Sequence, residues 1–261
     1  MSLSQNELYL AGLAAGTDKI SEHHYERYYS EALSYLRDHP DEAIFEIGLD
    51  QGASLRLWRT VLPLTQIYGL ELANGATGQK IEIFQGDQSI EGDLLSAAGK
   101  CDIPVAVIID DGSHLPEHQL MSFNVLFPRL LKEGGYYFIE DVEVSFWTDG
   151  EIYGYPVKNG LNKTNNIVNI FRQIVPLLYK KYMSAKDKAA FEDSCAALGI
   201  SPETISQIGE ISFGQNIIKI RKQWNSENPC FTQTYRFAER AHQLSASGSS
   251  SPSNASNSPS E

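Results

Sequence analysis

The stretch VIIDDGSHLPEHQ, residues 107–119, joins a strongly apolar segment to acids, a glycine, a serine and a histidine. Its β-branched start, with Val105 just upstream, is typical of a buried strand. Asp110 and Asp111 follow directly. This polar ending has two interpretations: the acids and His114 form a turn with a helix cap, or they face a ligand. What the other strands bring to the same edge decides between them.

Similar apolar segments recur along the chain. We expect strands at residues 43–47, 66–72, 80–84, 104–109, 135–139, 208–213 and 215–220. Helical spacing predicts helices between several of them, which implies a parallel sheet with helices on both faces. The last two strands are separated only by Gly214 and predict an antiparallel hairpin. The expected fold is an α/β, Rossmann-like, doubly wound, mostly parallel seven-stranded sheet with this antiparallel C-terminal hairpin.

The chain is expected to divide into three parts. Residues 1–40 form an N-terminal helical cap, which includes a helix over 21–39 that begins with Ser21 as its N-cap. Residues 41–244 form the main domain, with an insertion at about 147–200. The Ser-, Pro- and Asn-rich segment 245–261 has no apolar anchor and is expected to be disordered.

Composition excludes several classes of protein. The formal net charge is -12 and no basic stripe is present, which argues against a nucleic-acid partner. No apolar run is long enough to cross a bilayer, and neither a membrane span nor a signal peptide is expected. The three cysteines form no CxxC pair, so neither a zinc site nor a disulfide framework is expected. A cytoplasmic protein is the expectation.

Ligands of open parallel sheets bind at the carboxyl ends of the strands, so the residues that follow each strand are candidates for a site. After the first expected strand, Glu46 precedes a turn with Gly48 and Gly52, and Ser54 begins a helix. This spacing differs from GxGxxG, and a plain strand-to-helix turn explains it equally well. The second strand ends at Glu71, which is either a ribose ligand or a solvated loop acid.

Asp87 and Gln88 follow the third strand, where they could pair with an adenine edge or form a tight turn. The fourth strand ends in Asp110 and Asp111. The fifth ends in Glu140 and Asp141.

If the fourth and fifth strands are neighbours, these four carboxylates lie in one small space and raise each other's pKa. A hard cation such as Mg²⁺ would remove that conflict. The alternative is that some of the acids face solvent or cap helices.

His114 lies three residues beyond Asp111 and could exchange a proton near neutral pH. His118 follows at a spacing that would suit a zinc helix. Pro116 is expected in the first helical turn, so the two histidines do not share one regular helix. His118 is therefore expected on a helix surface or in packing.

These segments together resemble a known family, the class I S-adenosylmethionine-dependent methyltransferases, and within it the macrocin/mycinamicin group of sugar O-methyltransferases. The resemblance covers roughly residues 16–147. It is carried by Gly16-Thr17-Asp18-Lys19, His23-x-Tyr25, Glu46-Ile47-Gly48, Gly52-x-Ser54-Leu55-Arg56-x-Trp58, Gly69-x-Glu71, Gly86-Asp87-Gln88-Ser89, Asp110-Asp111-Gly112-Ser113-His114 and Gly134-Gly135-x-Tyr137-x-Ile139-Glu140-Asp141.

The resemblance implies roles for these residues. Asp111, Glu140 and Asp141 would hold Mg²⁺, and His114 would be the general base. Because strand faces alternate, only one of Asp110 and Asp111 is expected to be the nearer ligand. The residues implied to contact S-adenosylmethionine are Thr17, Tyr25, Glu46, Gly48, Gly52, Ser54, Glu71, Asp87, Gln88 and Asp110.

The resemblance further implies that segment 147–200 forms the acceptor pocket and that the partner is a small glycoside or polyol. A phenolic or catechol-like acceptor is an alternative, because such enzymes also use a metal at these strand ends. A cofactor-binding scaffold without turnover is a third reading. The sequence leaves the acceptor's identity and a homo-oligomeric state open.

Overall fold

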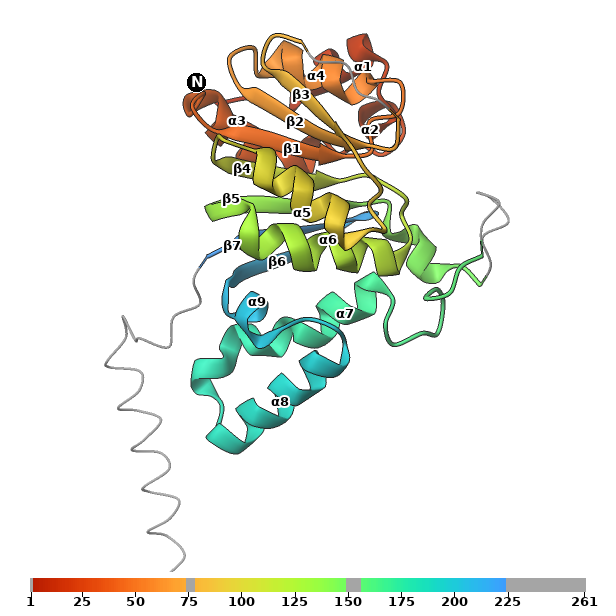
Figure 1. The fold of residues 1–261 in the computed structure, drawn as a ribbon, viewed down its shortest axis with the longest axis vertical. Coiled ribbons are helices and arrows are strands. Elements are labelled where there is room, and N and C mark those ends of the chain that lie inside the picture. Colours follow the sequence, from red (N-terminus) through yellow and green to blue (C-terminus); the bar gives the residue numbers. More distant parts are fainter. Residues whose placement is uncertain (1, 74–77, 149–155, 224–261) are drawn as a thin grey trace, which may run out of the picture. The chain divides into compact units, whose positions relative to one another are not determined.

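The computed structural model describes residues 2–73, 78–148 and 156–223. Within them a seven-stranded sheet has the order β3-β2-β1-β4-β5-β7-β6 (Figure 1). The strands are β1 Ala43–Ile47, β2 Gln66–Glu71, β3 Ile81–Gln85, β4 Val105–Asp110, β5 Leu131–Glu140, β6 Ile208–Gly214 and β7 Ile217–Lys222. The first five are parallel, and β7 runs antiparallel to both β5 and β6. The expected sheet and C-terminal hairpin are confirmed; the expected disordered tail lies outside the described residues.

The helices are α1 Gln5–Ala15, α2 Asp18–Ser21, α3 Glu26–Asp38, α4 Ala53–Val61, α5 Glu91–Lys100, α6 Pro116–Arg129, α7 Ile167–Ile174, α8 Ala185–Ala197 and α9 Pro202–Ser206, with 3-10 helices η1 Val142–Phe146 and η2 Val175–Tyr182. One expectation was wrong. Ser21 ends α2 rather than capping a helix over 21–39, and α3 begins only after Tyr25. His24 between them has a φ of 55°, a left-handed conformation that a continuous helix cannot contain.

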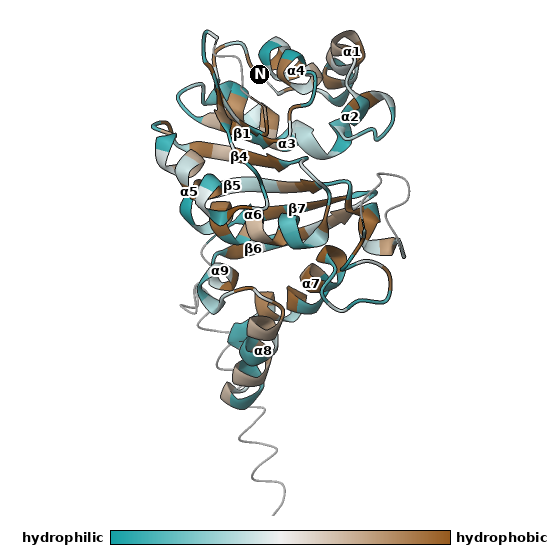
Figure 2. Ribbon diagram, turned by 45° about the vertical axis from the view of Figure 1, so that its right-hand side comes forward, coloured by the Kyte–Doolittle hydropathy of each residue, from teal (hydrophilic) through white to brown (hydrophobic). Residues whose placement is uncertain are grey.

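Two apolar cores cover the two faces of the sheet. Side chains of α1, α3 and α4 pack on one face, where Tyr29 meets Trp58 and Phe138 edge-on. Helices α5, α6 and α7 cover the other face, where Phe123 packs against Tyr137. In Figure 2, much of the ribbon of the central strands is brown, the colour of hydrophobic residues. The strands are thus buried on both sides, as parallel sheets require.

The order of the strands reverses between β1 and β4. From β1 the chain moves outward through β2 to β3, and then crosses to β4 on the other side of β1. Loops that leave the carboxyl ends of β1 and β4 therefore diverge and open a crevice between them. This crevice is the position at which the fold places a ligand site.

Helices α7, α8, α9 and η2 lie between η1 and the hairpin in the chain. They pack on one another, with further contacts from α7 and α9 to α6 and from η2 and α9 to β6. Among the described residues, none of the helices combines the length and hydrophobicity that a membrane crossing needs.

Candidate active site

A cavity of about 450 Å³ opens at the carboxyl ends of β1, β2 and β4, a size suited to a small-molecule ligand. Nine of the residues selected from the sequence line it: Thr17, Gly48, Ser54, Glu71, Asp87, Gln88, Asp111, His114 and Asp141. The other five do not: Tyr25, Glu46, Gly52, Asp110 and Glu140. Each of these five lies close behind the cavity wall or at its edge, as the contacts below show.

The turn after β1 forms the floor of the cavity and requires glycine. Gly48 has a φ of +78°, and a Cβ there would lie 2.1 Å from the carbonyl oxygen of Asp111. Gly52, with a φ of +73°, is the N-cap of α4. Glycine thus lets the turn after β1 pack directly against the backbone of the loop after β4, and α4 begins at the cavity.

Glu71 is held in a fixed orientation on the cavity wall. Its Oε2 accepts a hydrogen bond from the backbone N–H of Leu49 at 2.8 Å, and its Oε1 accepts one from the N–H of Leu72 at 2.8 Å. Each carboxylate oxygen still has a free lone pair. The group can therefore accept further hydrogen bonds from two neighbouring hydroxyls of a ligand.

Asp87 and Gln88 differ in what they offer to a ligand. Hydrogen bonds from Ser89, with a backbone distance of 2.7 Å, lower the pKa of Asp87, so its carboxylate is charged at the cavity. The amide of Gln88 already donates to Asp110 Oδ1 at 2.5 Å and accepts from the Ser113 N–H at 2.9 Å. Gln88 therefore joins β4 to the following loop, while Asp87 is the freer acceptor.

The register of β4 against β5 determines to which face of the sheet each of the four acids at their ends points. Asp110 lies opposite Ile139, so Glu140 lies one step further along and points to the other face of the sheet. Asp110 faces α6, where Tyr137 O–H donates to its Oδ2 at 3.2 Å. Burial raises the pKa of Asp110 to about 7, partly offset by hydrogen bonds, first that from Gln88.

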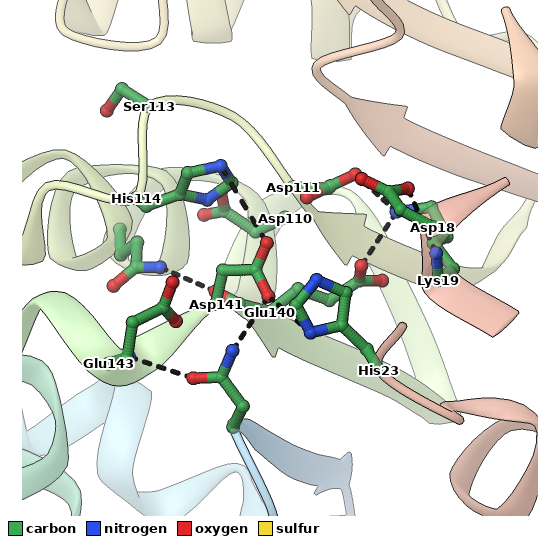
Figure 3. Close-up of polar contacts among 12 residues, drawn as sticks. Asp18, Lys19, His23, Asp110, Asp111, Ser113, His114, Glu140, Asp141 and Glu143 are labelled. Atoms are coloured by element: carbon green, nitrogen blue, oxygen red, sulfur yellow. Dashed lines mark hydrogen bonds and ion pairs between the residues drawn. The ribbon is translucent and has the colours of Figure 1, made fainter. Parts of the chain in front are cut away.

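On the opposite face, Lys19 is buried among three carboxylates, of which Figure 3 labels Asp111 and Glu140. Its Nζ donates to Asp111 Oδ2 and to Glu140 Oε2, the latter at 2.7 Å, and lies 3.3 Å from Glu46 Oε1. Burial opposes the charge of Lys19, but the carboxylates outweigh it and raise its pKa well above the usual value. The cluster thus contains one ammonium group and three carboxyl groups.

The two buried acids of this cluster accept hydrogen bonds from neutral donors in addition to their ion pairs with Lys19. Glu140 Oε1 also accepts from Tyr29 O–H, and Glu46 Oε2 accepts from Ser54 O–H at 2.9 Å and from Trp58 Nε1 at 2.8 Å. Burial raises the pKa of Glu140, against the opposing effect of Lys19. Glu46 and Glu140 therefore anchor Lys19 and α4, and neither lines the cavity.

Asp111, His114 and Asp141 remain as a group whose ligand atoms lie within 4.8 Å of one another. His114 Nε2 lies 3.9 Å from Asp141 Oδ2. Tyr25 O–H at 2.7 Å and Asn216 Nδ2 at 2.9 Å donate to Asp141 Oδ1, leaving Oδ2 directed at His114 (Figure 3). Two carboxylates that meet at a cavity, beside a cluster with more acids than bases, fit a divalent cation.

The loop that carries His114 is shaped by the start of α6. Pro116 is the first residue of that helix, and His114 lies before it with a φ of 58°. His118 is on the helix, and its Nδ1 lies 2.7 Å from Ser113 Oγ. The two histidines do not share a helix, as expected from Pro116. His114 faces the cavity, whereas His118 fixes the loop.

Lys19, Tyr137 and Asn216 are among the residues of this site that were given no role from the sequence. Lys19 and Tyr137 lie within segments that carry the family resemblance, so a signal was present. Three acids at neighbouring strand ends also require a nearby cation, and a lysine can supply it. Asn216 comes from the β6–β7 turn, about 75 residues from Asp141, and no local pattern predicts that contact.

No protein-family model matches the chain. It is 29% identical over 234 residues to the 8-demethyl-8-alpha-L-rhamnosyl tetracenomycin-C 2'-O-methyltransferase of Streptomyces olivaceus, over 83% of this chain and 55% of that protein. It is 35% identical over 133 residues to the demethylmacrocin O-methyltransferase of Streptomyces fradiae, over 48% of this chain and 32% of that protein. The chain thus spans about half the length, or less, of these relatives.

Among solved structures, the fold matches the MycE methyltransferase from the mycinamycin biosynthetic pathway, solved in complex with Mg, SAH and mycinamycin VI. The TM-score is 0.66 at 23% identity, over 86% of this chain and 57% of that one. This likeness shows a shared fold. The chain is thus similar in sequence to these O-methyltransferases and shares the fold of the MycE methyltransferase.

Proposed function

We propose that the protein is an S-adenosylmethionine- and Mg²⁺-dependent O-methyltransferase that acts on a sugar hydroxyl of a glycosylated small molecule. One observation carries the proposal. Asp111, His114 and Asp141 meet at the cavity that Gly48, Glu71 and Asp87 also line. A metal-binding pair, a base and a nucleoside site in one cavity are the components that such a transfer needs.

For the cofactor, Glu71 would accept hydrogen bonds from the ribose hydroxyls and Asp87 would lie near the adenine. Gly48 lets the turn after β1 lie directly against the Asp111 backbone, which brings these two sides of the cavity together. Thr17 lies in the same cavity, next to α2. Tyr25, Glu46, Gly52 and Asp110 would act through the residues that they hold in place rather than by touching the cofactor.

Asp111 and Asp141 would hold the cation, with His114 beside it. Glu140, implied as a ligand by the family resemblance, would instead hold Lys19, because it is buried and does not line the cavity. When bound, the cation would supply positive charge beside the acceptor oxygen, and the cofactor would supply the methyl group. Lys19 donates a hydrogen bond to Asp111 Oδ2 and so orients this carboxylate at the cavity.

His114 would remove the proton of the acceptor hydroxyl. Its Nε2 faces Asp141 Oδ2 across 3.9 Å, at the end of the cavity where the acceptor oxygen must meet the methyl group. Asp141 would lie beside the imidazole, close enough for both groups to contact the same bound ligand. The relatives are named as methyltransferases of a rhamnosyl tetracenomycin and of demethylmacrocin, which favours a sugar hydroxyl over a phenol.

The test is transfer of labelled methyl groups to a panel of glycosides, with Mg²⁺ or with EDTA. We expect product only with Mg²⁺, and His114→Ala should lower kcat by about 10²–10⁴-fold without changing cofactor affinity. His39→Ala is the matched control, because His39 is an exposed histidine at the end of α3 and does not line the cavity. Transfer that persists in EDTA would contradict the metal; near-normal turnover of His114→Ala would contradict the base.

If His114 is a metal ligand instead, the His114→Ala variant should require far more Mg²⁺ for half-maximal activity. A general base predicts that this Mg²⁺ concentration stays near the wild-type value while kcat falls. Titrating Mg²⁺ in the variant therefore separates the two roles.

A further inference from the structure

A second cavity, of about 520 Å³, lies on the other side of Asp141 from the cofactor cavity's His114. It is lined by the segment between α2 and α3, by η1, by α7 and by the β6–β7 turn. None of the roles proposed above uses it. Its position raises the question of what it would hold during methyl transfer.

Asp141 lines the first cavity and contacts two residues of the second. Its Oδ2 faces His114, while its Oδ1 accepts from Asn216 Nδ2 at 2.9 Å and lies 3.7 Å from His23 Nδ1 (Figure 3). His23 and Asn216 both line the second cavity. A molecule in this cavity would therefore be one side chain away from the catalytic group.

The lining of the second cavity is mostly apolar. Val142, Val168 and Ile217 contribute aliphatic surface, and two phenyl rings are left open to solvent: Phe146 is 57% exposed and Phe213 is 46% exposed. Phenylalanine is normally buried, and an exposed apolar group beside a cavity marks a binding surface. The lining thus favours a flat or branched apolar ring system.

Charge in the cavity disfavours a phosphorylated ligand. The acids Glu22 and Glu143 line it together with one guanidinium, that of Arg27. This guanidinium already donates to Gln215 Oε1 at 3.0 Å and stacks over Tyr28. A nucleoside diphosphate sugar would thus meet two negative groups and an engaged cation, so an uncharged aglycone is the better occupant.

We propose that the second cavity binds the apolar aglycone of the glycoside acceptor, so that the attached sugar extends past Asp141 to His114. The inference rests on the proposed function and adds the place and chemistry of the aglycone site. Phe146 and Phe213 are its specificity-determining residues. His23 and Asn216 position Asp141 at the boundary between aglycone and sugar.

The test compares two glycosides with one sugar and different aglycones: 4-methylumbelliferyl α-L-rhamnoside and methyl α-L-rhamnoside. Phe146→Ala and Phe213→Ala should each raise KM for the umbelliferyl glycoside on the order of tenfold, with kcat unchanged. The methyl glycoside should show no change. Tyr179→Ala, which removes a 58% exposed aromatic ring from η2 outside both cavities, is the matched control.

A second readout does not depend on turnover. In saturation-transfer NMR with S-adenosylhomocysteine and Mg²⁺ present, the umbelliferyl protons should receive saturation from the wild type and from Tyr179→Ala. They should receive much less from Phe146→Ala and Phe213→Ala. This binding pattern would support the aglycone site even if neither glycoside were methylated, a result that would count against the proposed function alone.

Three results would overturn the inference. The first is equal saturation of the umbelliferyl protons in wild type and in both phenylalanine variants, or none in the wild type. The second is an equal rise in KM for both glycosides. The third is that the deoxythymidine diphosphate form of rhamnose binds more tightly than the umbelliferyl glycoside and is unaffected by both variants.

Discussion

The ends of β4 and β5 carry the same motif, two adjacent acids, and the structure uses the two motifs in mirrored ways. On β4, the inner acid Asp110 turns toward α6 and the outer acid Asp111 turns toward Lys19. On β5, the inner acid Glu140 turns toward Lys19 and the outer acid Asp141 faces Tyr25 and His114. The inner acids are buried and bonded within the protein; the outer acids line the cavity.

The two inner acids, Asp110 and Glu140, differ in the groups that surround each buried carboxyl. Asp110 is surrounded by neutral donors, so burial holds its pKa near 7. Glu140 is paired with an ammonium, Lys19, which opposes the effect of burial on its pKa. A strand-end acid can thus be stabilised by neutralising it or by supplying a counter-charge, and only the second arrangement also orients an outer acid, Asp111.

The largest effect is expected from removing the counter-charge. Lys19→Met leaves Glu46, Glu140 and Asp111 without their ammonium, and at pH 8 the free energy of unfolding should fall by about 3–5 kcal/mol. Lys132→Met is the control, because its pair with Glu42 is more exposed and should contribute at most about 1 kcal/mol. Urea unfolding of both variants measures the difference. Similar losses would show that the Lys19 cluster is no more important than a surface pair.

The two acids of β4 should separate activity from structure. Asp111→Asn should lower the rate of methyl transfer on the order of 10²–10³-fold and raise the Mg²⁺ requirement. The substitution removes one of the two carboxylates proposed to hold the cation. Asp110→Asn should stay within several-fold of wild type at saturating cofactor, since Asp110 lies outside the cavity. Methyl-transfer rates over a Mg²⁺ titration provide the comparison. Equal losses in the two variants would remove the distinction between inner and outer acids.

Asp110 also predicts a pH dependence of stability. Its native pKa of about 7 exceeds the unfolded value of about 3.9, so the native state binds more protons between these pH values. Wild-type stability should therefore decrease as pH rises through this window. The unfolding free energy of Asp110→Asn, relative to wild type, should increase by up to about 1.4 kcal/mol per pH unit there.

Denaturation of wild type and Asp110→Asn at pH 5 and pH 8 measures this change. Glu82→Gln, at an exposed acid on β3, is the control and should show no comparable increase. A pH-independent difference between Asp110→Asn and wild type would mean that Asp110 is ionised throughout.

The smallest effect is expected from one of the neutral donors. Tyr137→Phe removes the 3.2 Å hydrogen bond to Asp110 while Gln88 still donates, and should lower the free energy of unfolding by about 1 kcal/mol. Tyr136→Phe is the control, because its partner Glu31 is exposed on the other face. Urea unfolding at neutral pH tests the pair. An equal or larger loss of unfolding free energy in Tyr136→Phe would show that the bond to buried Asp110 contributes no more than the bond to exposed Glu31.

Much of the fold follows from local patterns. Apolar runs of strand length alternate with helical spacing, and the parallel sheet with its final hairpin is their direct consequence. The boundary between α2 and α3 was not predictable, because the left-handed backbone at His24 leaves no mark on hydrophobic spacing. The short link at residues 22–25 depends on contacts such as that between Tyr25 and Asp141, which join distant segments.

The sequence by itself determined that four acids and His114 follow two strands and that glycines and Glu71 follow two others, because parallel strands bring their carboxyl ends to one edge. It could not assign each acid its side. That depended on the register of β4 against β5, where Asp110 opposite Ile139 sends neighbouring acids to opposite faces. It also depended on Lys19, Tyr25 and Asn216, which reach the strand ends from distant parts of the chain. Burial and long-range pairing set these contacts, and neither is a property of local sequence.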